Sequence, residues 1–181
     1  MNPVSHHIEY REFDPAADRI DQLTQVLNLA YKQLADMGLY YVAASQGSDV
    51  TLKRIQHARC FIAVADGGII GTISYYKPGT KTDCRWYSQP GVGVVGQFGI
   101  LPSWQGSGVG GTLLEMAERA AEKSGACELA LDTAETADHL IDYYQKRGYR
   151  FVAQTNWEAT NYRSVILSKK LRDFHNGSVK D

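Results

Sequence analysis

Hydrophobic and polar positions follow two periods along the chain, and together they predict a domain that mixes helices and strands. Apolar residues recur at helical spacing in four segments, which we expect to form helices at residues 14–37, 49–57, 108–123 and 138–147. Apolar runs bounded by turn residues predict seven strands, at residues 8–13, 60–65, 69–76, 92–101, 128–134, 149–157 and 164–171. The order β-α-α-β-β-β-α-β-α-β-β indicates a mixed α/β domain built around one sheet.

Cap and turn residues set the expected ends of several elements. Asp14-Pro15 has the composition of a helix start, with Asp as the cap and Pro at the first position. Gly38 would end the first helix, and Pro102 would stop the strand before it. Residues 79–91 are polar, rich in turn residues and long for a loop, so we interpret them as an insertion between two strands.

Length, charge and cysteine usage restrict the class of protein. The chain has 181 residues, so we expect residues 1–171 to form one domain and the polar residues 172–181 to form a tail. The formal net charge of −1 favours neither nucleic acid nor an anionic membrane as a partner. No apolar run approaches the ~18 residues needed to cross a membrane, and the first residues lack the apolar stretch of a signal peptide. The three cysteines form no CxxC pair, so we expect a cytoplasmic protein without a metal.

The sequence WQGSGVGGTLLEM, residues 104–116, places four glycines directly before and within the start of a predicted helix. Such a helix start presents free backbone N–H groups and the positive end of the helix dipole, which favours a phosphate or pyrophosphate. Glycine suits this role because a Cβ would hold the phosphate away from the amides. No Lys-Ser or Lys-Thr follows the glycines, which excludes a P-loop.

A dinucleotide-binding motif is one interpretation of these glycines. Gly106, Gly108 and Gly111 fit G-x-G-x-x-G, and Asp132 ends the next strand, where a ribose-binding acid would lie. Two features count against an NAD- or NADP-binding protein. Residues 102–105 separate the strand from the first glycine, and the chain after Asp132 is too short for the rest of a doubly wound sheet and a substrate domain.

Two motifs support another interpretation. Residues 100–110, ILPSWQGSGVG, resemble the acetyl-CoA motif of the GNAT N-acetyltransferase family, in which a strand and a Pro precede Gln/Arg-Gly-x-Gly-x-Gly/Ala at a helix start. Residues 143–149, YYQKRGY, resemble that family's Phe-Tyr-x-Lys-x-Gly-Phe. The resemblance covers nearly the whole chain and implies a single α/β domain, with about four helices around a mostly antiparallel, twisted sheet of six or seven strands. It further implies acetyl-CoA as co-substrate, a primary amine of a small molecule as acceptor, and a possible homodimer.

The resemblance assigns the coenzyme to the end of the strand and the glycine loop. The Phe98 amide would face the thioester carbonyl, where one good donor is worth ~3 kcal/mol, and the loop amides would hold the pyrophosphate. The residues expected to contact the coenzyme are Phe98, Gly99, Ile100, Gln105, Gly106, Ser107, Gly108, Val109 and Gly110.

Tyr144 matches the family's tyrosine beside the sulfur of coenzyme A. A thiol has a pKa near 8.5 and a tyrosine hydroxyl near 10, so proton donation is feasible without being strongly driven, and a hydrogen bond to the sulfur would also suffice. A packed aromatic residue on an amphipathic helix is the alternative interpretation of Tyr144. Its neighbour Tyr143 is the better candidate for the core.

The general base has no clear position in the sequence. Many family members carry an acid on the strand that ends at the glycine loop, where this chain has Gln97. Glu135 and Asp132, after the following strand, could act directly or through water, although each also suits a helix cap or a surface carboxylate. Ala137 stands where the family often has a coenzyme-binding Asn. The missing acid leaves a second function open, a non-catalytic sensor that binds acyl-CoA.

The expected acceptor site combines aromatic and polar side chains. Tyr40 and Tyr41 lie in the loop that covers the acceptor in the family, and Gln97 lies on the coenzyme strand. Trp86 and Tyr87, in the 79–91 insertion, suit either acceptor binding or a dimer contact.

Overall fold

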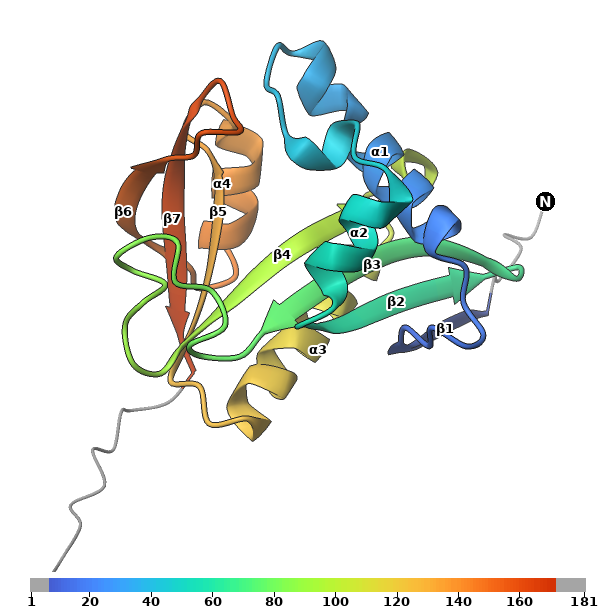
Figure 1. Cartoon of the computed structure of the whole chain (residues 1–181), viewed down its shortest axis with the longest axis horizontal. Helices are drawn as coiled ribbons and strands as arrows, with labels where there is room; N and C mark the ends of the chain where they lie inside the picture. Colours follow the sequence, from blue (N-terminus) through green and yellow to red (C-terminus); the bar gives the residue numbers. More distant parts are fainter. Residues whose placement is uncertain (1–6, 172–181) are drawn as a thin grey trace, which may run out of the picture.

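The computed structural model describes residues 7–171, which form one seven-stranded sheet with helices on both faces (Figure 1). The tail expected at residues 172–181 lies outside the described residues. The strands are β1 (Ile8–Glu12), β2 (Arg59–Ala65), β3 (Gly68–Tyr76), β4 (Val92–Ile100), β5 (Glu128–Ala134), β6 (Arg150–Asn156) and β7 (Arg163–Lys170). The described helices are α1 (Ile20–Asp36), α2 (Ser48–Ile55), α3 (Val109–Lys123) and α4 (Asp138–Gln145), with short 3-10 turns η1 (Val42–Ala44) and η2 (Pro102–Trp104).

The strand order is β1-β2-β3-β4-β5-β7-β6, and every neighbouring pair except β4–β5 is antiparallel. The predicted α/β domain with a mostly antiparallel sheet and four helices is thus confirmed. A doubly wound dinucleotide-binding fold would need a largely parallel sheet, so this topology contradicts the NAD interpretation.

The predicted start of the first helix is wrong. The Asp14 carboxylate accepts a hydrogen bond from the Ala16 amide, and the Asp14 carbonyl accepts from Ala17 and Asp18, so this segment folds as a turn. Asp18 then forms a two-bond ion pair with Arg11 of β1, at 2.6 and 2.8 Å. The helix begins only at Ile20. The prediction failed because Asp-Pro occurs both in turns and at helix starts.

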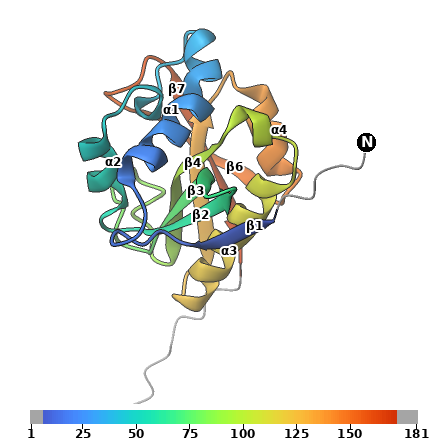
Figure 2. The same ribbon diagram turned by 90° about the vertical axis from the view of Figure 1, so that its right-hand side faces the viewer.

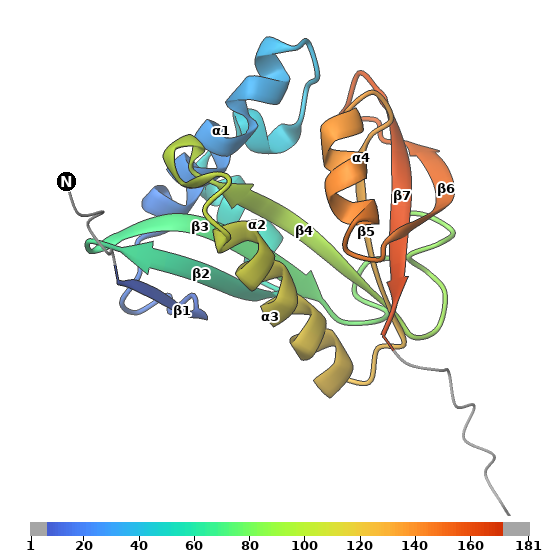
Figure 3. The same ribbon diagram turned by 180° about the vertical axis from the view of Figure 1, so that it is seen from behind.

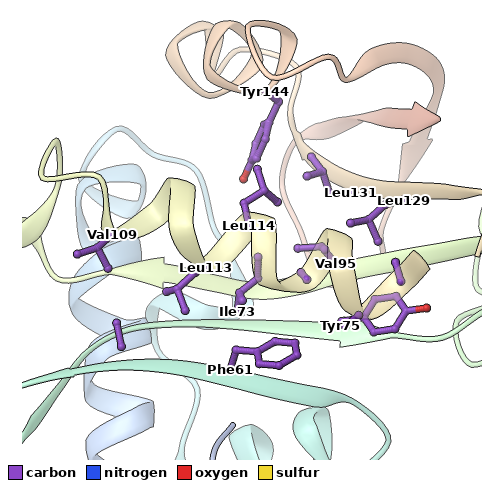
Figure 4. Packing of buried hydrophobic residues seen from close by; sticks show 14 of the residues in the cluster. Phe61, Ile73, Tyr75, Val95, Val109, Leu113, Leu114, Leu129, Leu131 and Tyr144 are labelled. Carbon is purple, nitrogen blue, oxygen red and sulfur yellow. The ribbon is translucent and has the colours of Figure 1, made fainter. Parts of the chain in front are cut away.

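The helices lie in two layers (Figure 2). Helices α1 and α2 cover one face of the sheet, and α3 and α4 cover the other, as the view from behind shows (Figure 3). Val109, Leu113 and Leu114 of α3 point into the main core, together with Ile73 of β3 (Figure 4). Each buried leucine contributes about 2 kcal/mol through the hydrophobic effect, which fixes the start of α3 against the sheet.

β4 and β5 diverge, and this divergence opens the middle of the sheet (Figure 3). They pair only where Val92–Val94 meets residues 128–130, although both strands continue beyond that point. A register shift between β3 and β4 also places Gln97 and Phe98 opposite Ile73, with Gln97 at a φ of 49°. Such a bulge bends the strand and changes the direction of its side chains. Over residues 7–171 no helix combines the length and apolar character that a membrane span requires.

Candidate active site

A cavity of about 450 Å³ lies where β4 and β5 separate. Its lining comes from α1, the end of β4, the glycine segment, the end of β5 and α4. Of the residues expected to contact the coenzyme, those that line it are Phe98, Gly99, Ile100, Gln105, Gly106, Gly108 and Gly110. The cavity also contains Tyr144, Tyr41 and Asp132, so it connects the predicted coenzyme site with candidates for chemistry and acceptor binding.

The glycine segment leaves amides free at the start of α3. Gly108 has a φ of 92° and precedes the helix, and a Cβ placed on it would meet no atom within 4 Å. The Thr112 amide bonds to the Gly108 carbonyl, whereas the amides of Val109, Gly110 and Gly111 find no acceptor within residues 7–171. The first turn carries no acidic residue. These groups fit a pyrophosphate, because N–H donors and the helix dipole favour an anion.

Three loop residues that were predicted to contact the coenzyme do not offer it a free side chain. The Val109 side chain is fully buried in the core. The Ser107 hydroxyl donates to the Trp104 carbonyl at 2.6 Å, and neither Val109 nor Ser107 lines the cavity. The Gln105 side chain lines the cavity but donates to the Ile100 carbonyl at 3.2 Å.

Gly99 allows α1 to approach the coenzyme strand. A Cβ at Gly99 would lie 2.9 Å from the Ala30 Cβ, closer than real Cβ atoms approach. This close packing brings Tyr31, the next residue of α1, into the cavity. Burial raises the pKa of the Tyr31 hydroxyl, and the nearby Phe98 backbone opposes that rise. The Tyr31 hydroxyl and the Phe98 backbone therefore lie close together.

Tyr144 is both packed in the core and part of the cavity lining. Its ring lies 6.4 Å from that of Phe98 and 5.9 Å from that of Tyr149, measured between centroids. It reaches from α4 towards α3 (Figure 4). Its hydroxyl makes no hydrogen bond among the described residues. Burial raises the pKa of Tyr144 well above its ordinary value of 10, so the hydroxyl is a hydrogen-bond donor at neutral pH.

The two candidate bases have different surroundings. Glu135 does not line the cavity and forms an ion pair with Arg163 at 2.8 Å. Asp132 lines the cavity, and it is the one carboxylate among residues 7–171 that does so. Its two oxygens accept hydrogen bonds from the Tyr87 hydroxyl at 2.9 Å and the Trp157 Nε1–H at 2.8 Å. These bonds fix the orientation of the Asp132 carboxylate.

The three residues that were predicted to bind the acceptor also have different surroundings. Tyr41 lines the cavity, accepts a hydrogen bond from the Ala134 amide at 2.9 Å, and lies 3.0 Å from the Thr133 hydroxyl. The Tyr40 side chain is 63% exposed and does not line the cavity. Gln97 is buried outside the cavity, where its side chain contacts that of Gln46 at 2.8 Å.

Sequence reasoning did not single out Tyr31, Tyr162 or Arg147. Tyr31 and Arg147 line the cavity. The Tyr41 ring lies 5.2 Å from Tyr31 and 4.7 Å from Tyr162. Tyr31 occupies an apolar helical position, which indicates a core residue, and Tyr162 lies in a polar loop, so neither position carries a local signal. Arg147 occupies the variable position of the Lys-x-Gly motif.

Known proteins share this sequence pattern and fold. The acetyltransferase (GNAT) family model matches residues 21–149. S-(2-succino)cysteine N-acetyltransferase of Bacillus subtilis (strain 168) is 29% identical over 157 residues, which cover 84% of this chain and 90% of that protein.

Solved structures agree on the fold. The structure of yncA from Salmonella typhimurium with its cofactor acetyl-CoA has a TM-score of 0.71 at 15% identity, covering 96% of this chain and 99% of that one. PaiA N-acetyltransferase of Thermoplasma acidophilum in complex with coenzyme A has a TM-score of 0.66 at 19% identity, covering 91% and 99%. The family match, which spans the glycine segment and α4, shows that this chain belongs to the acetyltransferase (GNAT) family and is an N-acetyltransferase.

Proposed function

We propose that the protein transfers the acetyl group of acetyl-CoA to the primary amine of a small, amino-acid-like acceptor, by direct attack while both substrates are bound. The observation that carries this proposal is one cavity that is lined by Gly110 and Gly111 of the first turn of α3, by Tyr144 and by Asp132. The relative that acts on S-(2-succino)cysteine supports an amino acid as the acceptor class.

The chain's own groups fit the coenzyme. The amides of Val109, Gly110 and Gly111 would hold the pyrophosphate. The edge of β4 that faces β5 is unpaired beyond Val94, and it could bond the extended pantetheine arm as a further strand. The coenzyme would supply a thioester, with a thiol as the leaving group. The Phe98 amide would donate to the thioester carbonyl oxygen, beside the Tyr31 hydroxyl.

Asp132 is our candidate for the base, in place of Glu135. The substrate amine must lose a proton as it attacks the thioester. The group that takes this proton must reach the cavity, directly or through one water. Asp132 meets this condition, whereas Glu135 is paired with Arg163 outside the cavity. The Tyr144 hydroxyl would donate a hydrogen bond to the departing sulfur, which lowers the energy of the thiolate.

A non-catalytic sensor loses its support in this arrangement. That interpretation depended on the absence of an acid on the coenzyme strand near Gln97, and Asp132 supplies a carboxylate to the cavity from β5. The homodimer and the cytoplasmic location expected from the sequence stay predictions.

The acceptor is tested by an amine panel with purified protein and acetyl-CoA. The panel contains S-(2-succino)cysteine, other S-substituted cysteines, ordinary amino acids, and a diamine without a carboxylate. Release of free thiol is followed with a thiol reagent, and mass spectrometry identifies the acetylated product. We expect turnover of amino-acid acceptors, with N-blocked versions of the same compounds as controls. Binding of acetyl-CoA without turnover of any amine would contradict the proposal.

A further inference from the structure

The glycine loop of this chain carries no cation for a pyrophosphate. The first position of its motif is Gln105, and that side chain is already bonded to the Ile100 carbonyl. The first turn of α3 has no charged residue that would neutralise a phosphate. Free amides and a helix dipole remain, but an anion with two charges is usually also met by a basic side chain.

Arg147 lies beside the first turn of α3, although it belongs to the segment after α4. A Cβ placed on Gly111 would lie 3.7 Å from the Arg147 Nη2 atom. The guanidinium stacks on the Tyr143 ring, 3.7 Å from its centroid, and Nη1 donates to the Tyr143 carbonyl at 3.1 Å. Arg147 lines the cavity, and no carboxylate within residues 7–171 forms an ion pair with it. Its charge is therefore fixed in place and not neutralised by the described protein.

The Tyr143 hydroxyl provides a second, independent observation. It is buried and has no hydrogen-bond partner among the described residues, which is uncommon for a hydroxyl in a folded protein. It lies 3.3 Å from the position that a Cβ on Gly110 would occupy, and Tyr143 lines the cavity. The resembling family motif has Phe at this position, so the hydroxyl is a departure from that motif.

We infer that Arg147 and Tyr143 form a second side of the pyrophosphate site, opposite the amides of α3. This inference rests on the proposed function, because it concerns the same coenzyme. Arg147 would donate to phosphate oxygens through its planar guanidinium, which the Tyr143 ring holds in orientation. The Tyr143 hydroxyl would gain the acceptor that it lacks within the protein. Arg147 thereby supplies the charge that Gln105 does not.

The test is a calorimetric titration of the whole chain with acetyl-CoA at low salt. Arg147→Gln is compared with Lys146→Gln, which removes the same charge one residue away, from an exposed side chain that does not line the cavity. We expect Arg147→Gln to raise the Kd about tenfold, as for one charge-assisted hydrogen bond, and Lys146→Gln to change it less than about twofold. Tyr143→Phe, which keeps the ring, should raise the Kd about threefold. Thermal unfolding without ligand checks that each variant is folded.

A second titration, with 3′-dephospho-coenzyme A, identifies the phosphate. This molecule keeps the pyrophosphate, so Arg147→Gln should weaken its binding by the same factor. The variant's Kd should also depend less on salt than the wild-type Kd. Equal affinity of the Arg147 and Lys146 variants would overturn the inference, and so would a loss that disappears with 3′-dephospho-coenzyme A. A wild-type protein that does not bind acetyl-CoA would instead overturn the proposed function, and this inference with it.

Discussion

Gly108→Ala separates the conformational role of the glycine loop from its ligand role. Gly108 has a φ of 92°, in the left-handed region, and a Cβ there would meet no atom within 4 Å. The substitution therefore adds backbone strain without a clash. Gly79, in the loop after β3, provides a matched control, because its φ is 83° and its Cβ would also meet no atom within 4 Å.

The two substitutions should cost similar stability. An alanine in the left-handed region is disfavoured by about 1–2 kcal/mol, and a chain of this size loses about 2–4 °C in Tm per kcal/mol. Gly108 directly precedes the free amides of α3, where a phosphate oxygen must approach to about 2.8 Å, whereas Gly79 lies in the loop after β3. We therefore expect Gly108→Ala to raise the Kd for acetyl-CoA at least about tenfold, or ~1.4 kcal/mol, and Gly79→Ala to leave it unchanged.

Thermal unfolding measures the strain, and calorimetric titration at a temperature where both variants are folded measures the affinity. If Gly108→Ala lost stability but bound acetyl-CoA as tightly as the wild type, the phosphate would not lie at the start of α3. If Gly79→Ala lost as much affinity as Gly108→Ala, the loss would reflect general destabilisation and the reasoning would fail.

Three further predictions concern the chemistry and the fold. Tyr144→Phe should lower kcat about 10–100-fold with little change in the Kd of acetyl-CoA, and the ratio of wild-type to variant kcat should stay constant from about pH 6 to 9, because burial keeps the pKa of Tyr144 above that range. Asp132→Asn should lower kcat/KM about 100-fold in the thiol-release assay, whereas Glu135→Gln, outside the cavity, should retain about half or more of the activity; the reverse order would refute the choice of base. Asp18→Asn should reduce the free energy of unfolding at pH 7 by about 1–2 kcal/mol. Because Arg11 lowers the pKa of Asp18, this stabilisation is present above the unfolded pKa of about 3.9 and is lost as the pH falls through the folded value, so urea unfolding of the two proteins should converge in acid.

The strands and most helices could be predicted because their signals are local. Each strand has an apolar run with turn residues beside it, and Pro102 ends β4 through its own backbone chemistry. The start of α1 could not be predicted in this way. Asp14-Pro15 permits both a turn and a helix start, and the choice involves Asp18, which pairs with Arg11 on a neighbouring strand.

In the candidate site, too, local features could be predicted from the sequence and long-range ones could not. Main-chain groups at the glycine loop follow from sequence, because positive φ and free amides are properties of the segment itself. Side-chain roles depend on which way each residue faces. Gln97 and Phe98 are adjacent in a bulge, yet only Phe98 lines the cavity. Asp132 and Glu135 are three residues apart, and the Arg163 side chain pairs with Glu135 outside the cavity.

The insertion at residues 79–91 illustrates how a segment without periodic signal can affect a site. Tyr87 is 3% exposed, and its hydroxyl donates to Asp132, so this side chain is already occupied within the molecule and is not available for a dimer contact. Trp157, just beyond the end of β6, donates to the other Asp132 oxygen, and the Tyr87 and Trp157 rings stack at 6.2 Å. A carboxylate held by two donors loses little rotational freedom when an amine binds, which lowers the entropic cost of forming that contact. The insertion therefore supports the proposed base through the orientation of its carboxylate, even though Tyr87 itself does not line the cavity.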